Sequence, residues 1–105
     1  MKMHELLDAP EKWTKRRMAR DENGEGLSYA HHPSAVSWCL LGARDVCYPY
    51  THYAPESAEM RGEITAHLER AIWKHYGEYI AVEDWNDDPK RTFDEVRAVL
   101  LEANI

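Results

Sequence analysis

The sequence predicts a single mainly α-helical domain that spans residues 1–105, with three main helices, a short N-terminal helix and room for a small β-hairpin near residues 13–30. A chain of 105 residues can form one modest hydrophobic core and is too short for two. Two long segments place apolar residues at helical spacing, and a helix-capping pattern precedes a third helix. Together these observations define the predicted fold class.

The first two main helices are predicted from their apolar stripes. The first is expected to begin at Pro33 and end near Cys47, and the second to run from Glu56 to Tyr76, where Gly77 stops it. The stripe of the first helix consists of Val36, Cys39, Leu40, Ala43, Val46 and Cys47. The stripe of the second consists of Met60, Ile64, His67, Leu68, Ala71, Ile72 and His75. Gly42 predicts either close packing or an early end of the first helix.

Local signals predict the remaining elements. Residues 3–9 are expected to form a short helix that Pro10 stops, and residues 21–26, "DENGEG", favour a tight turn. Residues 78–82 are expected to be briefly extended. The last helix is expected to follow Thr92, because Thr92 and Glu95 have the spacing of a capping box.

The stretch before the last helix has the spacing of a calcium loop. The oxygen-bearing residues that match the ligand positions are Asp84, Asn86, Asp88, Thr92 and Glu95. However, Pro89 occupies the position that needs glycine, and Arg91 occupies one that should be apolar. We therefore interpret the stretch as a structural entry to the last helix. In this interpretation Trp85 anchors a turn made by Asn86 and Asp87, and Arg91 pairs with Asp87 or Glu95.

The two cysteines are predicted to be free thiols. No cofactor is predicted for the protein. Cys39 and Cys47 would lie about 12 Å apart along a helix, too far for a disulfide, which is typical of a reducing compartment. A small enzyme that uses either cysteine with a histidine is one alternative function, although no nucleophile signature surrounds them. A metal-stabilised domain is another. The possible ligands His31, His32, Cys39, Cys47 and His52 match no compact zinc spacing.

The charge distribution limits the expected partners. A net charge of −6 disfavours general nucleic-acid binding. The basic segment from Lys12 to Arg20 leaves nucleic-acid binding as an alternative. Acidic residues instead dominate between Glu78 and Glu95. The sequence contains no apolar run long enough to cross a membrane and no signal peptide, so a cytoplasmic location is expected. The sequence does not specify an oligomeric state.

The segment "CYPYTHYAP" is the candidate partner-binding surface. Tyrosine is enriched at interface hot spots, and a loop of this length has difficulty burying all its rings. The alternative is that one or two tyrosines cap the core. The predicted partner-binding residues are Tyr48, Tyr50, His52, Tyr53, Arg16 and Arg17.

Three segments carry a family resemblance. They are "WTKRRMARDENG", "HPSAVSWCLLGA" and "WNDDPKRTFDEVRAVL". In this order they resemble a family of small bacterial and phage proteins of unknown function. The matching positions are Trp13, Ala19, Arg20, Asp21, Gly24, Pro33, Ala35, Val36, Trp38, Cys39, Gly42, Ala43, Trp85, Asn86, Asp87, Pro89, Arg91, Thr92, Glu95 and Val96. Lys90 stands where members usually have glycine, and the tyrosine-rich segment has no counterpart.

The resemblance implies a phage or bacterial accessory protein and supplies no activity. Small size, separated charges and a tyrosine-rich loop favour a non-catalytic protein-binding modulator. Inhibition of a host defence or regulatory complex is the expected role, and a catalytic role is the less favoured alternative.

Overall fold

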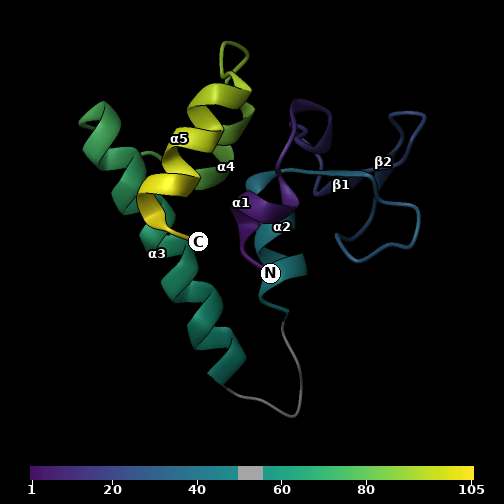
Figure 1. Ribbon diagram of the computed structural model, residues 1–105, viewed down its shortest axis with the longest axis horizontal. Coiled ribbons are helices and arrows are strands. Elements are labelled where there is room, and N and C mark those ends of the chain that lie inside the picture. The colour runs from purple at the N-terminus through teal and green to yellow at the C-terminus, as the bar shows by residue number, and fades with distance from the viewer. Residues whose placement is uncertain (50–55) are drawn as a thin grey trace.

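A computed structural model of the chain describes residues 1–49 and 56–105 (Figure 1). Its helices are α1 (Met3–Leu6), the 3₁₀ helix η1 (Pro10–Lys12), α2 (Leu40–Cys47), α3 (Glu56–Tyr76), α4 (Val82–Asp87) and α5 (Phe93–Ala103). Its strands are β1 (Ala19–Arg20), β2 (Gly26–Leu27) and β3 (Ser37–Trp38). A mainly helical fold with a small sheet is therefore confirmed.

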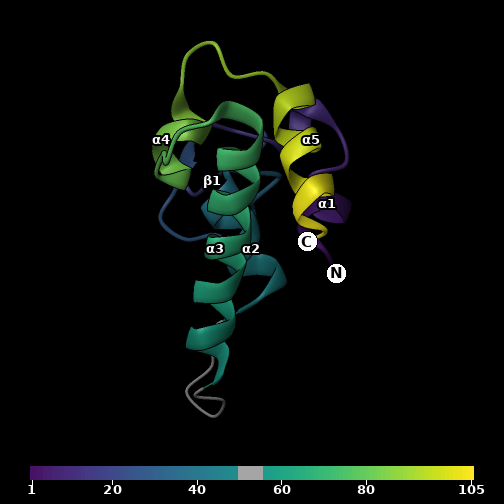
Figure 2. The ribbon, with the colours of Figure 1, turned by 90° about the vertical axis from the view of Figure 1, so that its left-hand side faces the viewer.

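The helices enclose the core, and the sheet lies on the side away from α3. Figures 1 and 2 show α3 and α5 side by side, while α2 packs between α1, α3 and α4. The core residues are Met3, Leu7, Leu40, Ala43, Ile64, Leu68, Ala71, Ile72, Val82, Trp85, Val96, Val99, Leu100 and Ile105. Within the described part of the chain, no helix is both long and apolar enough to cross a membrane.

Helix α3 has the predicted bounds, but its buried face is shorter than predicted. From Ala58 onward, where the burial of its side chains is described, its buried residues all fall between Ile64 and Ile72. Met60, His67 and His75 are exposed, contrary to the predicted stripe. Met60 is exposed because the N-terminal half of α3 extends beyond α5 (Figures 1 and 2). His75 lies in the last turn of the helix, and His67 lies at the edge of the stripe.

The predicted start of the first main helix at Pro33 is wrong. The backbone before α2 pairs with the sheet instead: the Val36 N–H donates to Arg20 O at 2.9 Å, and the Cys39 N–H donates to Met18 O at 3.3 Å. Val36 is consequently exposed rather than buried. Cys39 caps the N-terminus of α2, where its Sγ accepts the Gly42 N–H at 3.3 Å.

The sheet extends the predicted hairpin by one strand. Its order is β2-β1-β3 and both pairs are antiparallel. The turn between β1 and β2 forms as expected, because the Asp21 carboxylate accepts the N–H groups of Asn23 and Glu25, each at 2.9 Å. The short helix near the N-terminus ends at Leu6, earlier than predicted, and Pro10 starts η1 at a position where proline is well tolerated.

Residues 82–87 differ from the prediction of an extended piece followed by a turn. They form α4, whose first intrahelical bond runs from the Trp85 N–H to Ala81 O at 2.9 Å. The helix forms because Val82, Trp85 and Asn86 share one buried face. The turn begins at Asp88, after Asn86 and Asp87, the two residues that were expected to make it.

The entry to α5 follows the prediction. Thr92 caps the helix and forms a reciprocal capping box with Glu95, and Asn104 ends the helix in the left-handed conformation. Arg91 pairs with Glu95 at 3.0 Å and with Asp88 at 3.8 Å. The alternative pairing of Arg91 with Asp87 does not form.

Candidate functional site

Asn86 connects three parts of the chain that are distant in sequence. Its Oδ1 accepts the Trp13 indole N–H at 2.8 Å and the Leu40 N–H at 3.1 Å. Its Nδ2 donates to Thr14 O at 3.1 Å and to the Asp87 carboxylate at 3.0 Å. Asn86 is fully buried, so these bonds satisfy polar groups that water cannot reach. Asn86 therefore holds α4, the start of α2 and the N-terminal segment together.

Arg91 occupies an aromatic site beside α4. Its guanidinium carbon lies 4.0 Å from the Trp85 ring centroid and 5.0 Å from that of Tyr76. Its Nη1 donates to the Glu95 carboxylate at 3.0 Å, and its Nε donates to Trp85 O, also at 3.0 Å. Only 8% of the side chain is exposed, so cation–π attraction and the ion pair act with little competition from water.

Several donors lower the pKa of the Glu95 carboxyl below its ordinary value. The largest contribution is the hydrogen bond from the Thr92 N–H, and the Tyr76 hydroxyl and the Arg91 charge add to it. The pKa of Tyr76 is raised, mainly by burial and secondly by the hydrogen bond that its hydroxyl donates to the Glu95 carboxylate. Glu95 is thus held in its charged form at neutral pH.

We expect Glu95→Gln to lower the free energy of unfolding at pH 7 by about 0.5–1 kcal/mol, because the charge beside Arg91 and the helix N-terminus is lost. A lowered pKa in the folded state stabilises the fold above the unfolded pKa, which is roughly 4.3. This stabilisation disappears as the pH falls through the lower folded value. Urea unfolding should therefore show a smaller difference from wild type at pH 3 than at pH 7.

A matched control is Glu63→Gln, which changes an exposed glutamate of α3. It should alter stability by less than about 0.5 kcal/mol at either pH. Equal losses for the two variants at pH 7, or a Glu95→Gln loss that is undiminished at pH 3, would contradict the assigned role of the Glu95 charge.

Three of the five basic side chains in the segment from Lys12 to Arg20 form ion pairs or hydrogen bonds within the protein. Lys12 pairs with Asp8 at 2.9 Å. Lys15 Nζ donates to Asp88 O at 2.8 Å, at the end of α4. Arg20 donates to Thr14 Oγ1, Lys15 O and Gly24 O. The remaining two residues of the segment, Arg16 and Arg17, are exposed.

Arg16 and Arg17 border a small, mainly apolar pocket of about 160 Å³. Its other lining residues are Met18, Cys39, Leu41, Glu83, Asn86 and Asp87. Arg16 has a φ of 70°, and its N–H donates to the Asp87 carboxylate at 2.8 Å, which holds this strained residue in place. The pocket therefore lies against the same α4 segment that Asn86 anchors.

The two cysteines are free, as predicted, but their surroundings disfavour the thiolate. Burial raises the pKa of Cys39, and burial also raises the pKa of Cys47. A raised pKa reduces the fraction of nucleophilic thiolate at neutral pH. The pocket that Cys39 borders is lined by no histidine from the described part of the chain.

The described residues also give no group of three His, Cys, Asp or Glu side chains that could hold a metal ion. His31 Nε2 lies 2.8 Å from Asp45 O, and His32 Nδ1 accepts the Ser34 N–H at 3.0 Å. One ring nitrogen of each histidine thus has a backbone partner. His52, another candidate ligand, lies outside the described residues.

The predicted tyrosine surface is described only at its first residue. Tyr48 is half-buried and packs against the core, and Tyr50, His52 and Tyr53 lie outside the described residues. Tyr48 follows the C-terminus of α2, whereas the pocket of Arg16 and Arg17 borders Cys39 at its N-terminus. The structure therefore places these two parts of the predicted surface at opposite ends of α2.

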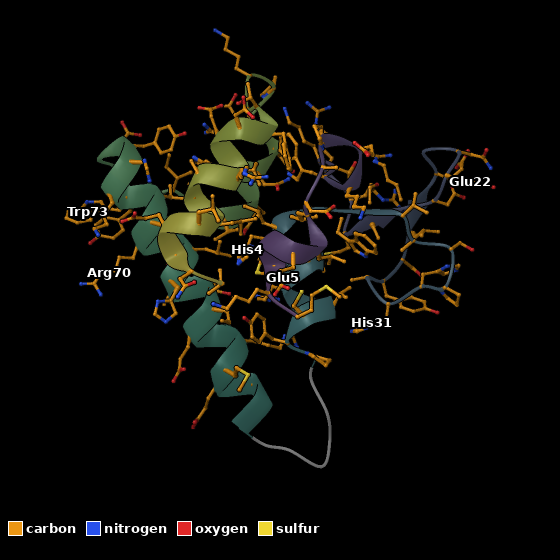
Figure 3. All side chains as sticks on the ribbon, in the orientation of Figure 1. His4, Glu5, Glu22, His31, Arg70 and Trp73 are labelled. Atoms are coloured by element: carbon orange, nitrogen blue, oxygen red, sulfur yellow. The ribbon has the colours of Figure 1, made fainter. Side chains whose placement is uncertain are left out.

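An exposed aromatic pair, made by one residue of α3 and one residue that follows the helix, was not predicted from the sequence. The rings of Trp73 and Tyr79 stack at a centroid distance of 5.9 Å with an interplanar angle of 19°, and 44% of Trp73 and 83% of Tyr79 are exposed. A groove of about 340 Å³ lies beside them, lined by Ala66, Glu69, Arg70, Trp73 and Tyr79. Figure 3 shows Trp73 and Arg70 projecting from α3 on the side away from α5.

The sequence did contain a signal for this surface. Trp73 is a large apolar residue outside the predicted stripe of α3, so that helix position points to solvent. Tyr79 follows Gly77, whose φ of 70° turns the chain back after α3. We name the surface formed by Glu69, Trp73 and Tyr79 the α3 aromatic face.

Comparison with known proteins identifies the family. The family described as "Family of unknown function (DUF6197)" matches residues 1–104. The chain belongs to this family. Comparisons with curated proteins and with solved structures gave no match.

Proposed function

We propose that this protein is a non-catalytic protein-binding domain that modulates a partner complex. The observation that supports it best is the α3 aromatic face, where two large rings are exposed beside a groove. Tryptophan and tyrosine are enriched among interface hot spots because they offer a large contact area for a small loss of side-chain entropy. An accessory role of bacterial or phage type, directed at a host defence or regulatory complex, completes the proposal.

The α3 aromatic face differs from an ordinary exposed apolar residue because its two rings already stack on each other. A pre-organised pair loses less conformational freedom when it binds. Two charged residues, Glu69 and Arg70, line the same groove as the rings, which resembles an apolar anchor with polar neighbours. These features favour a protein surface as the partner.

We expect a Trp73→Ala/Tyr79→Ala variant to lose its partner. Tagged wild-type protein should capture a specific partner from a lysate of its native host, and the variant should recover at least about 10-fold less, since hot-spot truncation costs more than about 1–2 kcal/mol per residue. The matched control is Met60→Ala/Leu101→Ala, which removes apolar side chains of similar exposure on other surfaces. Quantitative mass spectrometry of the captured proteins provides the measurement.

Equal recovery by wild type, variant and control would refute a role for the α3 aromatic face. A wild-type protein that captures no specific partner would refute the proposed function itself. A Tyr50→Ala/Tyr53→Ala variant, tested in parallel, determines whether the predicted tyrosine surface contributes to the same partner.

A further inference from the structure

We propose that the α3 aromatic face binds an arginine side chain that the partner protein displays. This inference rests on the proposed protein-binding function and specifies the chemistry of the partner. It combines three observations: an internal site of the same composition, the arrangement of the exposed rings, and the charges around them.

The molecule already contains an arginine site built from tryptophan, tyrosine and glutamate. Arg91 lies 4.0 Å from the Trp85 centroid and 5.0 Å from the Tyr76 centroid, and it pairs with Glu95 at 3.0 Å. A planar guanidinium stacks on aromatic faces and still donates hydrogen bonds in its own plane to a carboxylate. Trp85, Tyr76 and Glu95 together use both properties.

The α3 aromatic face has the same three residue types on the surface. Glu69 lines the groove beside Trp73 and Tyr79, and it also lines an adjoining pocket of about 130 Å³ with Tyr79, Ile80 and Ala81. Glu69 is therefore a carboxylate-bearing residue that borders both hollows. The external rings are stacked at 19°, whereas Tyr76 and Trp85 meet edge to face at 65°. A guanidinium would consequently lie flat on the stack, with its edge toward Glu69.

In the described part of the chain, the cations that lie over aromatic rings are Lys15 and Arg91. Neither of them lies over Trp73 or Tyr79. The neighbouring chain favours a cation, because exposed Glu78 and Asp84 flank the segment that carries Tyr79. The protein as a whole has a charge of −6. A basic partner segment thus complements this face in both charge and ring chemistry.

Arg70 is the basic residue that lines the groove, and its charge opposes this arrangement. It also borders a separate hollow with His67 and Lys74 on the other flank of α3. Its positive charge should weaken the binding of a second guanidinium. This makes Arg70→Ala an informative variant, because it should strengthen binding if the ligand is a cation and leave it unchanged if the ligand is a neutral apolar group.

The test uses the whole protein and the peptide acetyl-Gly-Arg-Gly-Arg-Gly-amide. The control peptide carries citrulline in place of both arginines, which keeps the shape and removes the charge. The readout is the indole N–H signal of Trp73 in nitrogen-15 spectra, identified by its absence from Trp73→Phe. The other three tryptophans of the chain, Trp13, Trp38 and Trp85, serve as internal references.

We expect the arginine peptide to shift the Trp73 signal in a saturable manner and the citrulline peptide to shift it at least about 5-fold less at equal concentration, since the cation supplies most of the attraction. Glu69→Gln should weaken binding about 3-fold, and Arg70→Ala should strengthen it by a similar factor. Equal shifts by both peptides would overturn the proposal, as would an unchanged affinity in Glu69→Gln. A Trp73 shift that depends on protein concentration alone would point to a second copy of the chain and also overturn it.

The result separates this inference from the proposed function. If Trp73→Ala/Tyr79→Ala loses the captured partner but the arginine peptide does not bind, the binding surface stands and the arginine chemistry is wrong. If the peptide binds but the captured partner is indifferent to Trp73 and Tyr79, placement of the partner on this face is wrong.

Discussion

Replacing Asn86 with alanine should lower the free energy of unfolding by about 3–5 kcal/mol, since buried donors and acceptors left without partners cost about 1–3 kcal/mol each. The truncation removes the acceptor for the Trp13 indole and for the Leu40 N–H, and the donor for Thr14 O. Domains of this size have a total stability of about 5–15 kcal/mol. The variant should therefore lose a large fraction of its stability.

Urea denaturation followed by circular dichroism measures this effect. Asn23→Ala is the control, because Asn23 is an exposed asparagine in the β1–β2 turn and should change stability by less than about 0.5 kcal/mol. Asn86→Asp provides a second comparison: it keeps the acceptor oxygens, loses the donor to Thr14 O and brings a second carboxylate beside Asp87. A loss below about 1 kcal/mol for Asn86→Ala would contradict the connecting role assigned to Asn86.

The parts of the fold that depend on local signals were predictable. Helix α3 has the predicted bounds, and the Thr92–Glu95 capping box starts α5 as expected, because both features depend on residues within one or two helical turns. The start of α2 was missed for the opposite reason. Residues near Val36 have a helical pattern, but their N–H groups bond to the backbone of residues 18–20, a long-range pairing that no local pattern records.

The role of Asn86 illustrates the same limit within the site. Its type and position favoured a turn, and its side chain was expected to bond nearby backbone. The structure instead places it on a buried helix face, where its partners Trp13 and Leu40 come from distant segments. The exposure of Trp73 in the α3 aromatic face could be predicted from helical periodicity alone, since Trp73 lies outside the apolar stripe. Tyr79 stacks on Trp73 because Gly77 reverses the direction of the chain.

The two glycines within α2 and α3 should respond to alanine in opposite directions. A Cβ on Gly42 would lie 2.0 Å from Met18 O, far inside van der Waals contact. That carbonyl also accepts the Cys39 N–H at 3.3 Å, so it cannot move without disturbing the junction of the sheet and α2. A Cβ on Gly62 meets nothing within 4 Å. The predicted close packing at Gly42 is therefore a contact with the Met18 carbonyl.

We expect Gly42→Ala to destabilise the protein by about 2–3 kcal/mol, because overpacking outweighs the gain of about 1 kcal/mol in helix propensity. Gly62→Ala should stabilise it by about 0.5–1 kcal/mol, since only the propensity gain remains. Thermal unfolding followed by circular dichroism distinguishes the two, because each kcal/mol shifts the Tm of a domain this size by about 4–8 °C. Shifts of the same sign would show that the α2–Met18 contact yields easily, and that the backbone there is not fixed by the sheet. Opposite signs would demonstrate that the same substitution reports helix propensity on an open surface and backbone contact in the interior.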